Sequence, residues 1–579
     1  MMRKKGNTAR RIENSQFSIS PSLAEEILYN PATLIGHDKH RLFFLFAIGL
    51  FLCGIPFCRP LMSIGLILLS ANWLAEGNFK WKWQQMRHNR ILWVCLLPYA
   101  VHLIGLTYTS NLPYAFTDLT IKLPMLLLPL IIATTAPLTA KEWKLLLNIY
   151  LIAVCFSALF GLIHFKTHSE LTDKRFLAVY ISYIRFELNL CFALFVGIWL
   201  FRQQQRSRLR WLYATSILWI IFIILYVGAF TAIALSIFAL FFLLVRFSIQ
   251  HSKWYFHKLV PALLAAAVIG GLLVMRHYIR QYTHADFDFS TADSYTVNGN
   301  PYCDSLENLQ IENNMYVYAY VCDIELQQAW NRRSDIRYYS DTAIHCNAIR
   351  GNLIRFLNSK SLRKDSVGVS MLSDEEIRLI EQGIPNVNYA SNIGFKVRLY
   401  ENLWEIINYL RFGEGLGSVP QRFEAWKISL LAIGEHPWFG IGTGDVKDTF
   451  LQKLETEQSP IQGILVRSHN QYLSFGIAFG IVGLAIILFS LVYPPFAAGK
   501  RNILYHLFLL IFLISMLTDD PLERQDGVCL FAVFNSLFLF LAEDGRQEAG
   551  DRRQETEDRR RKAEDGRQEA GDRRLKAGD

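Results

Sequence analysis

The position of His469 suggests chemistry more directly than that of any other residue, because it lies where polar sequence gives way to an apolar run over 470–494. An ionisable side chain at the edge of a membrane span indicates a functional site by default. The positive end of a helix dipole disfavours imidazolium, so a histidine that opens a helix stays neutral and able to accept a proton. The alternative is a helix-capping or interfacial histidine.

Three arginines could place positive charge near this histidine. Arg422 lies in the first turn of a predicted helix, one turn before Trp426, and Arg467 precedes His469 by two residues. Arg185 stands at the outer end of a predicted span. The planar guanidinium suits phosphate oxygens and stays charged at any working pH. The alternatives are a solvated arginine at 422 and an interfacial one at 185.

Two further segments are candidates for a site near His469. Asp519 and Asp520 fall in the connector between the last two predicted spans, either near the site or in an ordinary solvated turn. Two adjacent aspartates suggest a metal, but no histidine or further carboxylate cluster accompanies them in sequence, so we expect no metal site. The glycines at 440, 442 and 444 have neither the strand nor the lysine-bearing helix of a phosphate-binding loop, and we expect a tight turn.

The composition indicates an integral membrane protein. The 579 residues are 52% hydrophobic and 14% aromatic, and the mean hydropathy is +0.21. Apolar runs near 20 residues recur, and each is long enough to cross a bilayer. The formal net charge of +9 comes largely from short connectors on one side, as the positive-inside rule requires. No basic stripe interleaved with aromatics indicates nucleic-acid binding.

Hydropathy and charge together predict an all-α polytopic fold with about 12 transmembrane helices and both termini in the cytoplasm. A cytoplasmic segment covers 1–41, nine spans follow within 42–275, and a large periplasmic loop domain covers 276–469. Three more spans lie within 470–542, and a charged repeat tail over 543–579 is expected to be cytoplasmic and disordered. The predicted spans are 42–57, 60–76, 91–107, 121–137, 144–165, 184–201, 211–227, 229–246, 258–275, 470–494, 503–518 and 526–542.

The loop domain is expected to be mainly helical. Its early part favours loop with short strands, and helices are predicted near 374–384 and 395–410. A third begins at Pro420 and ends before the His436-Pro437 pair. A disulfide between Cys303 and Cys322 is one possibility if the domain faces an oxidising compartment.

Two motifs carry a resemblance to a known family. Residues 469–483 read HNQYLSFGIAFGIVG, and residues 421–445 read QRFEAWKISLLAIGEHPWFGIGTGD. The first resembles the His-Asn signature of the O-antigen ligase and polymerase family, and the second resembles its arginine-to-tryptophan helix with the glycine turn. The predicted twelve spans, with a large loop between the ninth and tenth, also fit that family.

The resemblance implies transfer of a glycan from undecaprenyl diphosphate to a hydroxyl of lipid A–core oligosaccharide, on the periplasmic face of the bacterial inner membrane. It implies an inverting, metal-independent reaction with no cofactor. His469 would be the base, and cations would hold the diphosphate as its charge grows. The implied substrate-binding residues are Arg422, Arg185, Asn470, Trp426 and Arg467.

One departure from the family pattern keeps alternatives open. Many members carry an arginine at the junction of the seventh and eighth spans, where this chain has Ala229 and Phe230. Arg185 is the expected substitute, and an inactive member is the alternative. An O-antigen polymerase or a protein O-oligosaccharyltransferase shares the same motifs. A transporter or flippase predicts inverted repeats with broken helices, which the sequence does not display.

Overall fold

The computed structural model describes residues 31–168, 174–250, 254–285, 293–303, 309–339, 349–390, 394–413, 417–499 and 502–541. Within these ranges the chain is helical apart from one two-stranded antiparallel sheet, β1 (Ile311–Glu312) with β2 (Met315–Tyr316). The predicted all-α membrane class is confirmed. The charged tail over 543–579 and most of the N-terminal segment lie outside the described residues.

Helices able to span a membrane come from both ends of the chain. In the described part, eight are long and apolar enough, or nine if the bent pair α3–α4 is one span. Three shorter apolar helices accompany them, and the count of twelve spans stays a prediction. The N-terminal helices are α2 (Pro31–Phe57), α3 (Arg59–Ala75), α4 (Phe79–His88), α5 (Arg90–Gly105), α6 (Leu112–Lys122), α7 (Pro124–Ala133), α8 (Ala140–Thr167), α9 (Tyr183–Gln203), α10 (Ser207–Val227), α11 (Phe230–Gln250) and α12 (Trp254–Thr283).

One predicted span begins too late in the sequence. Hydropathy placed it at 121–137, whereas the helical segment runs from Leu112 through α6 and α7 to Ala133. The omitted part contains Asp118, which forms a buried i,i+4 ion pair with Lys122 in the structure. The pairing removes the isolated charges that would otherwise exclude these residues from a span.

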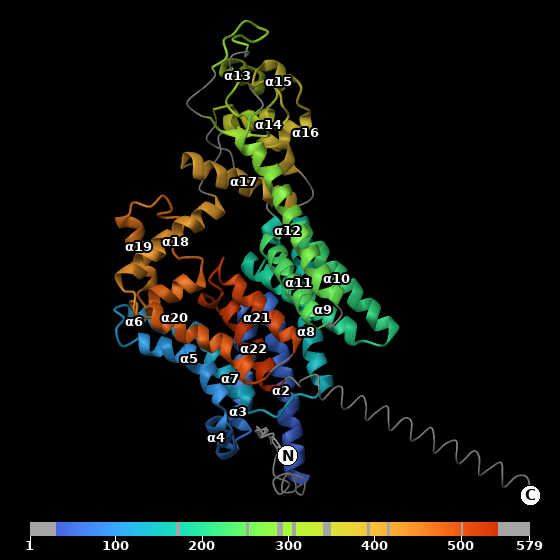
Figure 1. The fold of residues 1–579 in the computed structure, drawn as a ribbon, viewed down its shortest axis with the longest axis vertical. Helices are drawn as coiled ribbons and strands as arrows, with labels where there is room; N and C mark the ends of the chain where they lie inside the picture. Colours follow the sequence, from blue (N-terminus) through green and yellow to red (C-terminus); the bar gives the residue numbers. More distant parts are fainter. Residues whose placement is uncertain are drawn as a thin grey trace, which may run out of the picture.

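A separate helical unit follows α12. The helix α12 extends from the bundle to this membrane-distal unit (Figure 1). Its helices are α13 (Asp323–Asn331), α14 (Ile349–Ser359), α15 (Ser366–Ser370) and α16 (Asp374–Glu381). They share a separate core that includes Trp330, Leu353 and Phe356. The helix predicted near 374–384 is confirmed by α16.

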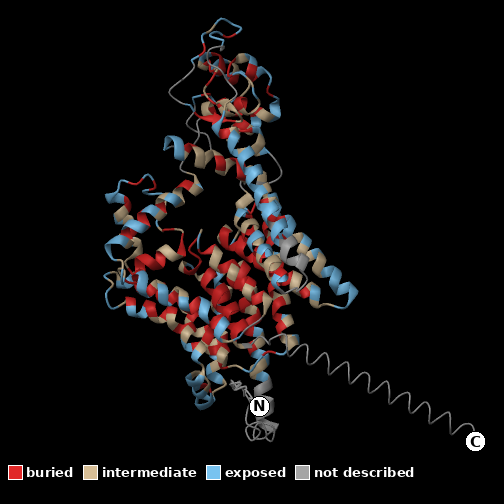
Figure 2. Cartoon of the chain, in the orientation of Figure 1, coloured by how far each residue is buried: buried red, intermediate tan, exposed pale blue. Residues whose placement is uncertain are grey.

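The chain then returns to the bundle through α17 (Gly394–Phe412), α18 (Ser418–Glu435) and α19 (Val446–Thr456), which confirms the other two predicted loop helices. The last membrane helices are α20 (Gln471–Ala497), α21 (Ile503–Ser515) and α22 (Gln525–Ser536), with a short 3₁₀ turn η4 (Pro521–Glu523) between the last two. Burial concentrates where α9, α21 and α22 meet, whereas α12 is largely exposed (Figure 2).

The suggested disulfide is wrong: Cys303 and Cys322 are separate thiols. The Cys303 amide donates a hydrogen bond to the carbonyl of Val321, so the two segments are neighbours. Cys303 is exposed and Cys322 is buried.

Candidate active site

His469 has an unusual backbone conformation that fixes its side chain at the mouth of α20. Its φ is +48°, in the left-handed region that few non-glycine residues adopt. Asn470 follows in extended geometry, and its side chain accepts hydrogen bonds from the amides of Tyr472 (3.0 Å) and Leu473 (3.2 Å). Such backbone strain concentrates at functional sites. The capping interaction holds the strained residue in place.

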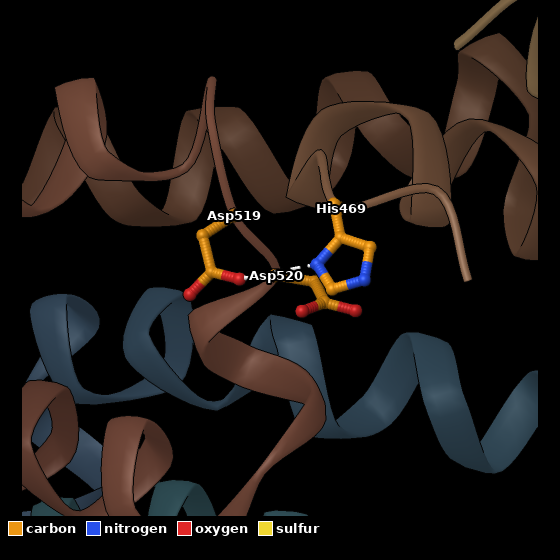
Figure 3. Close-up of side chains that lie close together, drawn as sticks. All are labelled: His469, Asp519 and Asp520. Carbon is orange, nitrogen blue, oxygen red and sulfur yellow. Dashed lines mark ion pairs between the residues drawn. The ribbon is translucent and has the colours of Figure 1, made fainter. Parts of the chain in front are cut away.

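Two aspartates face this imidazole. Nδ1 of His469 lies 3.6 Å from Oδ1 of Asp519, and ligand atoms of His469, Asp519 and Asp520 lie within 4.8 Å of one another. Figure 3 shows the Asp519 carboxylate on the Nδ1 side of the ring and the Asp520 carboxylate below the ring, with the other ring nitrogen turned away from Asp519. The two aspartates are buried, whereas the histidine keeps 29% of its side-chain surface. The imidazole therefore contacts buried carboxylates and remains partly exposed to solvent. The alternative of a solvated Asp519–Asp520 turn is wrong, because both aspartates are buried.

Arg185 lies in the first turn of α9 and contacts both aspartates. Its guanidinium forms an ion pair with Asp519, lies 3.8 Å from the Asp520 carboxylate and 4.0 Å from that of Asp526. It also donates a hydrogen bond of 2.9 Å to the carbonyl of Asp520. In this structure Arg185 therefore neutralises and orders the aspartates that face His469. Its role as a diphosphate ligand stays a prediction.

The same cluster has the donor set of a cation site. A histidine and two carboxylates suit several divalent metals, and no sequence pattern predicted that His469 would join the aspartate pair. The observed neighbour of these carboxylates is the Arg185 guanidinium, which already supplies positive charge to them. The expectation of a metal-independent site stays a prediction.

The electrostatic surroundings keep His469 neutral. Burial lowers the pKa of the imidazole, the positive charges of Arg422, Arg185 and Arg524 lower it further, and only Asp520 among its main partners raises it. A histidine with a lowered pKa is deprotonated at neutral pH and is competent as a general base. The same interaction shows that α18 brings Arg422 close enough to influence His469.

Trp426 lies one turn after Arg422 on α18. Its ring packs edge-on to Phe423, with centroids 5.9 Å apart. The indole Nε1 is buried and has no hydrogen-bond partner among the described residues. A buried indole N–H usually has a partner, so this donor remains available to a ligand. The substrate-binding role predicted for Trp426 stays a prediction that this geometry favours.

The N-terminus of α20 is clamped to the loop that carries the aspartates. The Gln471 amide donates hydrogen bonds to the carbonyls of Met516 (2.9 Å) and Asp519 (3.1 Å). The Gln471 side chain donates to Glu523 (2.8 Å) and accepts from the Leu522 amide (2.7 Å). The backbone of Gln471, two residues after His469, thus links the histidine's segment to Asp519.

Two cations complete this clamp. Lys122 of α6 pairs with Asp118 and lies 3.3 Å from the Glu523 carboxylate. Arg467 donates to the Glu523 carbonyl (3.2 Å) and to the Tyr114 hydroxyl (3.4 Å). Burial raises the pKa of Glu523, but Lys122 and Arg467 outweigh it and leave that pKa below its usual range. Arg467 was predicted to bind substrate; here it contacts the Glu523 turn, and the substrate role stays a prediction.

Asn470 is also engaged within the protein. Its oxygen caps α20, and its Nδ2 donates a hydrogen bond of 3.0 Å to the carbonyl of Leu517. The structure therefore gives it a capping role, and substrate binding by Asn470 stays a prediction.

The glycine turn is part of a backbone junction between α5 and α20. The Ile441 and Gly442 amides donate to the carbonyls of Ile477 (3.1 Å) and Ala478 (2.9 Å). At its end, Asp445 accepts hydrogen bonds from the amides of Ser110 and Asn111. The tight turn predicted from the sequence is present.

Polar residues farther along α9 are also structural. Glu187 accepts a hydrogen bond of 3.0 Å from the Thr231 amide, at the start of α11. The Asn189 side-chain oxygen accepts from the Tyr150 hydroxyl (2.9 Å). Glu187 therefore caps the helix that begins at Phe230, where the family's arginine is missing.

Residues 371–488 match the family model for O-antigen ligase. The resemblance predicted from the sequence is confirmed over this stretch, which contains α17, α18, His469 and most of α20. It associates this part of the chain with glycan transfer of the O-antigen ligase or polymerase type. An uncharacterized protein of Haemophilus influenzae is 26% identical over 121 residues. That alignment covers 21% of this chain and 30% of that protein.

Most of the residues that support His469 lie outside its motif. Sequence reasoning singled out His469 and the arginines but left Asp519 and Asp520 unassigned, and it overlooked Gln471. The only signal was adjacent acids between two apolar runs. Glu523 was noted in the same connector without a role, and the other overlooked members of the cluster and clamp are Lys122 and Asp526.

Proposed function

We propose that this protein transfers a glycan from undecaprenyl diphosphate to a hydroxyl of lipid A–core oligosaccharide, as an O-antigen ligase. The observation that carries the proposal is His469, neutral and partly exposed to solvent, with buried aspartates beside it and arginines around it. The family match over 371–488 supports the substrate class.

In this mechanism His469 takes the proton of the acceptor hydroxyl through its open ring nitrogen. The oxygen attacks the anomeric carbon from the side opposite the diphosphate, and the configuration inverts. The carbon–oxygen bond to the diphosphate breaks, and the electron pair leaves on undecaprenyl diphosphate. Asp519 stabilises the imidazolium that forms, and the proton then passes to water.

Arg422 is the proposed ligand of the leaving diphosphate. It is partly exposed, lies near His469 and offers a fork that matches phosphate oxygens. Arg524 is a second cation in the same neighbourhood. Growing negative charge on the diphosphate is stabilised more strongly in the transition state than in the bound donor, which accelerates the transfer.

The proposed orientation places His469 and the α13–α16 unit in the periplasm, with both termini in the cytoplasm. The donor's polyprenyl chain stays in the bilayer while its diphosphate reaches the site from the membrane surface.

The test is the surface lipopolysaccharide of a strain that lacks this gene and receives either wild type or His469→Ala. The ligase proposal expects that only wild type restores the polymer ladder and that undecaprenyl-linked polymer of normal length accumulates without it. Single repeat units on the core of the deletion strain would instead identify a polymerase. Unchanged lipopolysaccharide with loss of protein-linked glycan would identify a protein O-oligosaccharyltransferase, and a full ladder with His469→Ala would refute the mechanism.

A further inference from the structure

The helix α18 and the turn after it expose a group of large apolar side chains. Leu430 exposes 59% of its surface, Trp438 64% and Phe439 67%, and Phe423 is also exposed. The opposite side of α18 buries small and apolar residues against α20 in one core cluster. Exposed apolar groups concentrated on one element mark an interaction surface.

This turn lies beside a candidate membrane span. The amide of Ile481 donates to the carbonyl of Pro437 (2.8 Å), and that of Val482 donates to the carbonyl of Trp438 (3.2 Å). Both donors belong to the span Gln471–Ala497, and both expose their side chains. Ile481 lies about 15 Å of helix path from the first residue of α20. The turn is therefore at the level of residues inside the span, beyond its polar end.

The contact between the turn and α20 is a direct backbone approach. α20 breaks its helical geometry at Gly480, where φ is +61° and ψ is −165°. A Cβ on Gly480 would lie 2.4 Å from the carbonyl carbon of Trp438. Irregular backbone within a membrane requires partners from the protein, and the carbonyls of Pro437 and Trp438 accept from the two amides that follow the break.

The surrounding side chains are those of a membrane–water interface. The hydroxyl of Tyr108, just after α5, donates a hydrogen bond of 2.9 Å to the carbonyl of Phe439. Tryptophan and tyrosine are enriched at that interface because they combine an apolar ring with a polar group. Lys427 is exposed one turn after Phe423, and a lysine there can extend its amine to lipid headgroups.

We propose that α18 and the 436–439 turn form a re-entrant interfacial element that inserts into the bilayer leaflet on the His469 side. The side chains that enter the lipid are Phe423, Leu430, Trp438 and Phe439. The occupant of this surface is the phospholipid of the bilayer that the spans cross, because the turn continues the exposed surface of α20. Within the extramembrane domain predicted over 276–469, α18 and this turn then belong to the membrane surface, whereas the polar helix α19 after them stays outside the bilayer.

If the proposed function holds, this placement also positions Arg422 for the donor diphosphate. Arg422 and the inserted residues share one helix, so the lipid surface sets the height of Arg422 relative to His469. A donor diphosphate lies at that same surface because its polyprenyl chain is in the bilayer.

The test uses nitroxide labels on single cysteines at Leu430 and Phe439, in full-length protein reconstituted into nanodiscs of phosphatidylethanolamine and phosphatidylglycerol. The exposed and partly exposed cysteines Cys53, Cys58, Cys155 and Cys303 are replaced by Ser, as is Cys346, to remove background labelling. Power-saturation spectroscopy compares collisions with oxygen, which concentrates in lipid, and with a nickel chelate, which stays in water. Tyr339, 60% exposed in the membrane-distal unit, is the aqueous control, and Leu240, 54% exposed in α11, is the lipid control.

We expect both labels to favour oxygen over nickel, as Leu240 does, and Tyr339 to show the reverse. Labels that favour nickel would overturn the proposal, and so would labels shielded from both reagents, which would indicate a protein partner. The readout requires no glycan transfer, so a negative result here leaves the proposed function standing. Conversely, if the lipopolysaccharide experiment refutes the proposed function, the result of the labelling experiment still decides whether α18 and the turn insert into lipid.

Discussion

The side-chain amide of Gln471 donates a hydrogen bond of 2.8 Å to the carboxylate of Glu523, and the Gln471 backbone amide also reaches the carbonyl of Asp519. This pair joins the start of α20 to the loop before α22. His469 lies two residues before Gln471, and Asp519 lies four before Glu523. The His469–Asp519 approach therefore depends on an interaction between residues that do not react.

The contribution of the buried Lys122 ion pairs to stability can be tested by Lys122→Met. The substitution leaves Asp118 and Glu523 without their shared lysine, and breaking a buried ion pair costs about 3–5 kcal/mol. We expect a lower denaturation midpoint of the purified protein in detergent, with a smaller loss for Lys122→Arg. Lys141→Met, at an exposed lysine, is the matched control and should change stability by less than about 0.5 kcal/mol. Equal stability of Lys122→Met and wild type would show that the pair contributes nothing.

His469→Asn separates the chemistry of the imidazole from the strain of its backbone. Asparagine tolerates positive φ better than most residues, so the variant should keep the fold at φ +48° while losing the base. Loss of a general base costs about 10²–10⁴-fold in rate. The measurement is transfer from a purified lipid-linked donor to lipid A–core, together with the thermal midpoint. Activity within threefold of wild type would show that another group takes the proton.

The lowered pKa of His469 sets the acid side of the pH–rate profile. The base must be neutral, so the rate should fall as pH drops through a midpoint below 6.5. Because the Asp520 carboxylate raises this pKa, Asp520→Asn should move the midpoint to still lower pH. Asp448→Asn, at a carboxylate that contacts Asn111, is the control and should leave it unchanged. A midpoint that rises with Asp520→Asn would contradict the assignment.

The sequence predicted the membrane class and the histidine for physical reasons. Long apolar runs have few stable arrangements outside a bilayer, and a polar-to-apolar boundary marks His469 by itself. The start of α6 was misplaced because hydropathy counts Asp118 and Lys122 as separate charges, whereas their ion pair is a tertiary fact.

The partners of His469 could not be predicted, since no local pattern connects them. Asp519 follows it by 50 residues, and Arg185 precedes it by 284. Asp519 and Arg185 come together because α21 packs beside α9. No spacing of residues in the sequence predicts that packing. The glycine turn was predicted as a turn, but its partner is the break in α20 at Gly480, which lies in an apolar run that predicts one unbroken span over 470–494.

The need for a divalent cation can be decided by chelation. Arg185 already provides positive charge to Asp519 and Asp520, so transfer by the purified protein should be unchanged after EDTA treatment and dialysis. Added Mg²⁺ or Mn²⁺ should give no stimulation. Loss of activity on chelation, with recovery on adding one of these ions, would instead identify His469, Asp519 and Asp520 as its ligands.

Two glycines of the α18–α20 contact make a matched pair for stability. Gly480→Ala places a methyl 2.4 Å from the Trp438 carbonyl carbon at a φ of +61°, so both sterics and backbone conformation oppose it. Gly434→Ala lies in α18 with nothing within 4 Å of the new methyl, and alanine is favoured over glycine in a helix by about 0.5–1 kcal/mol. We expect the first to lower the thermal midpoint in nanodiscs sharply and the second to leave it equal or higher. If Gly480→Ala were as stable as Gly434→Ala, the turn would not be packed against α20, and the re-entrant placement of Trp438 would lose its structural support.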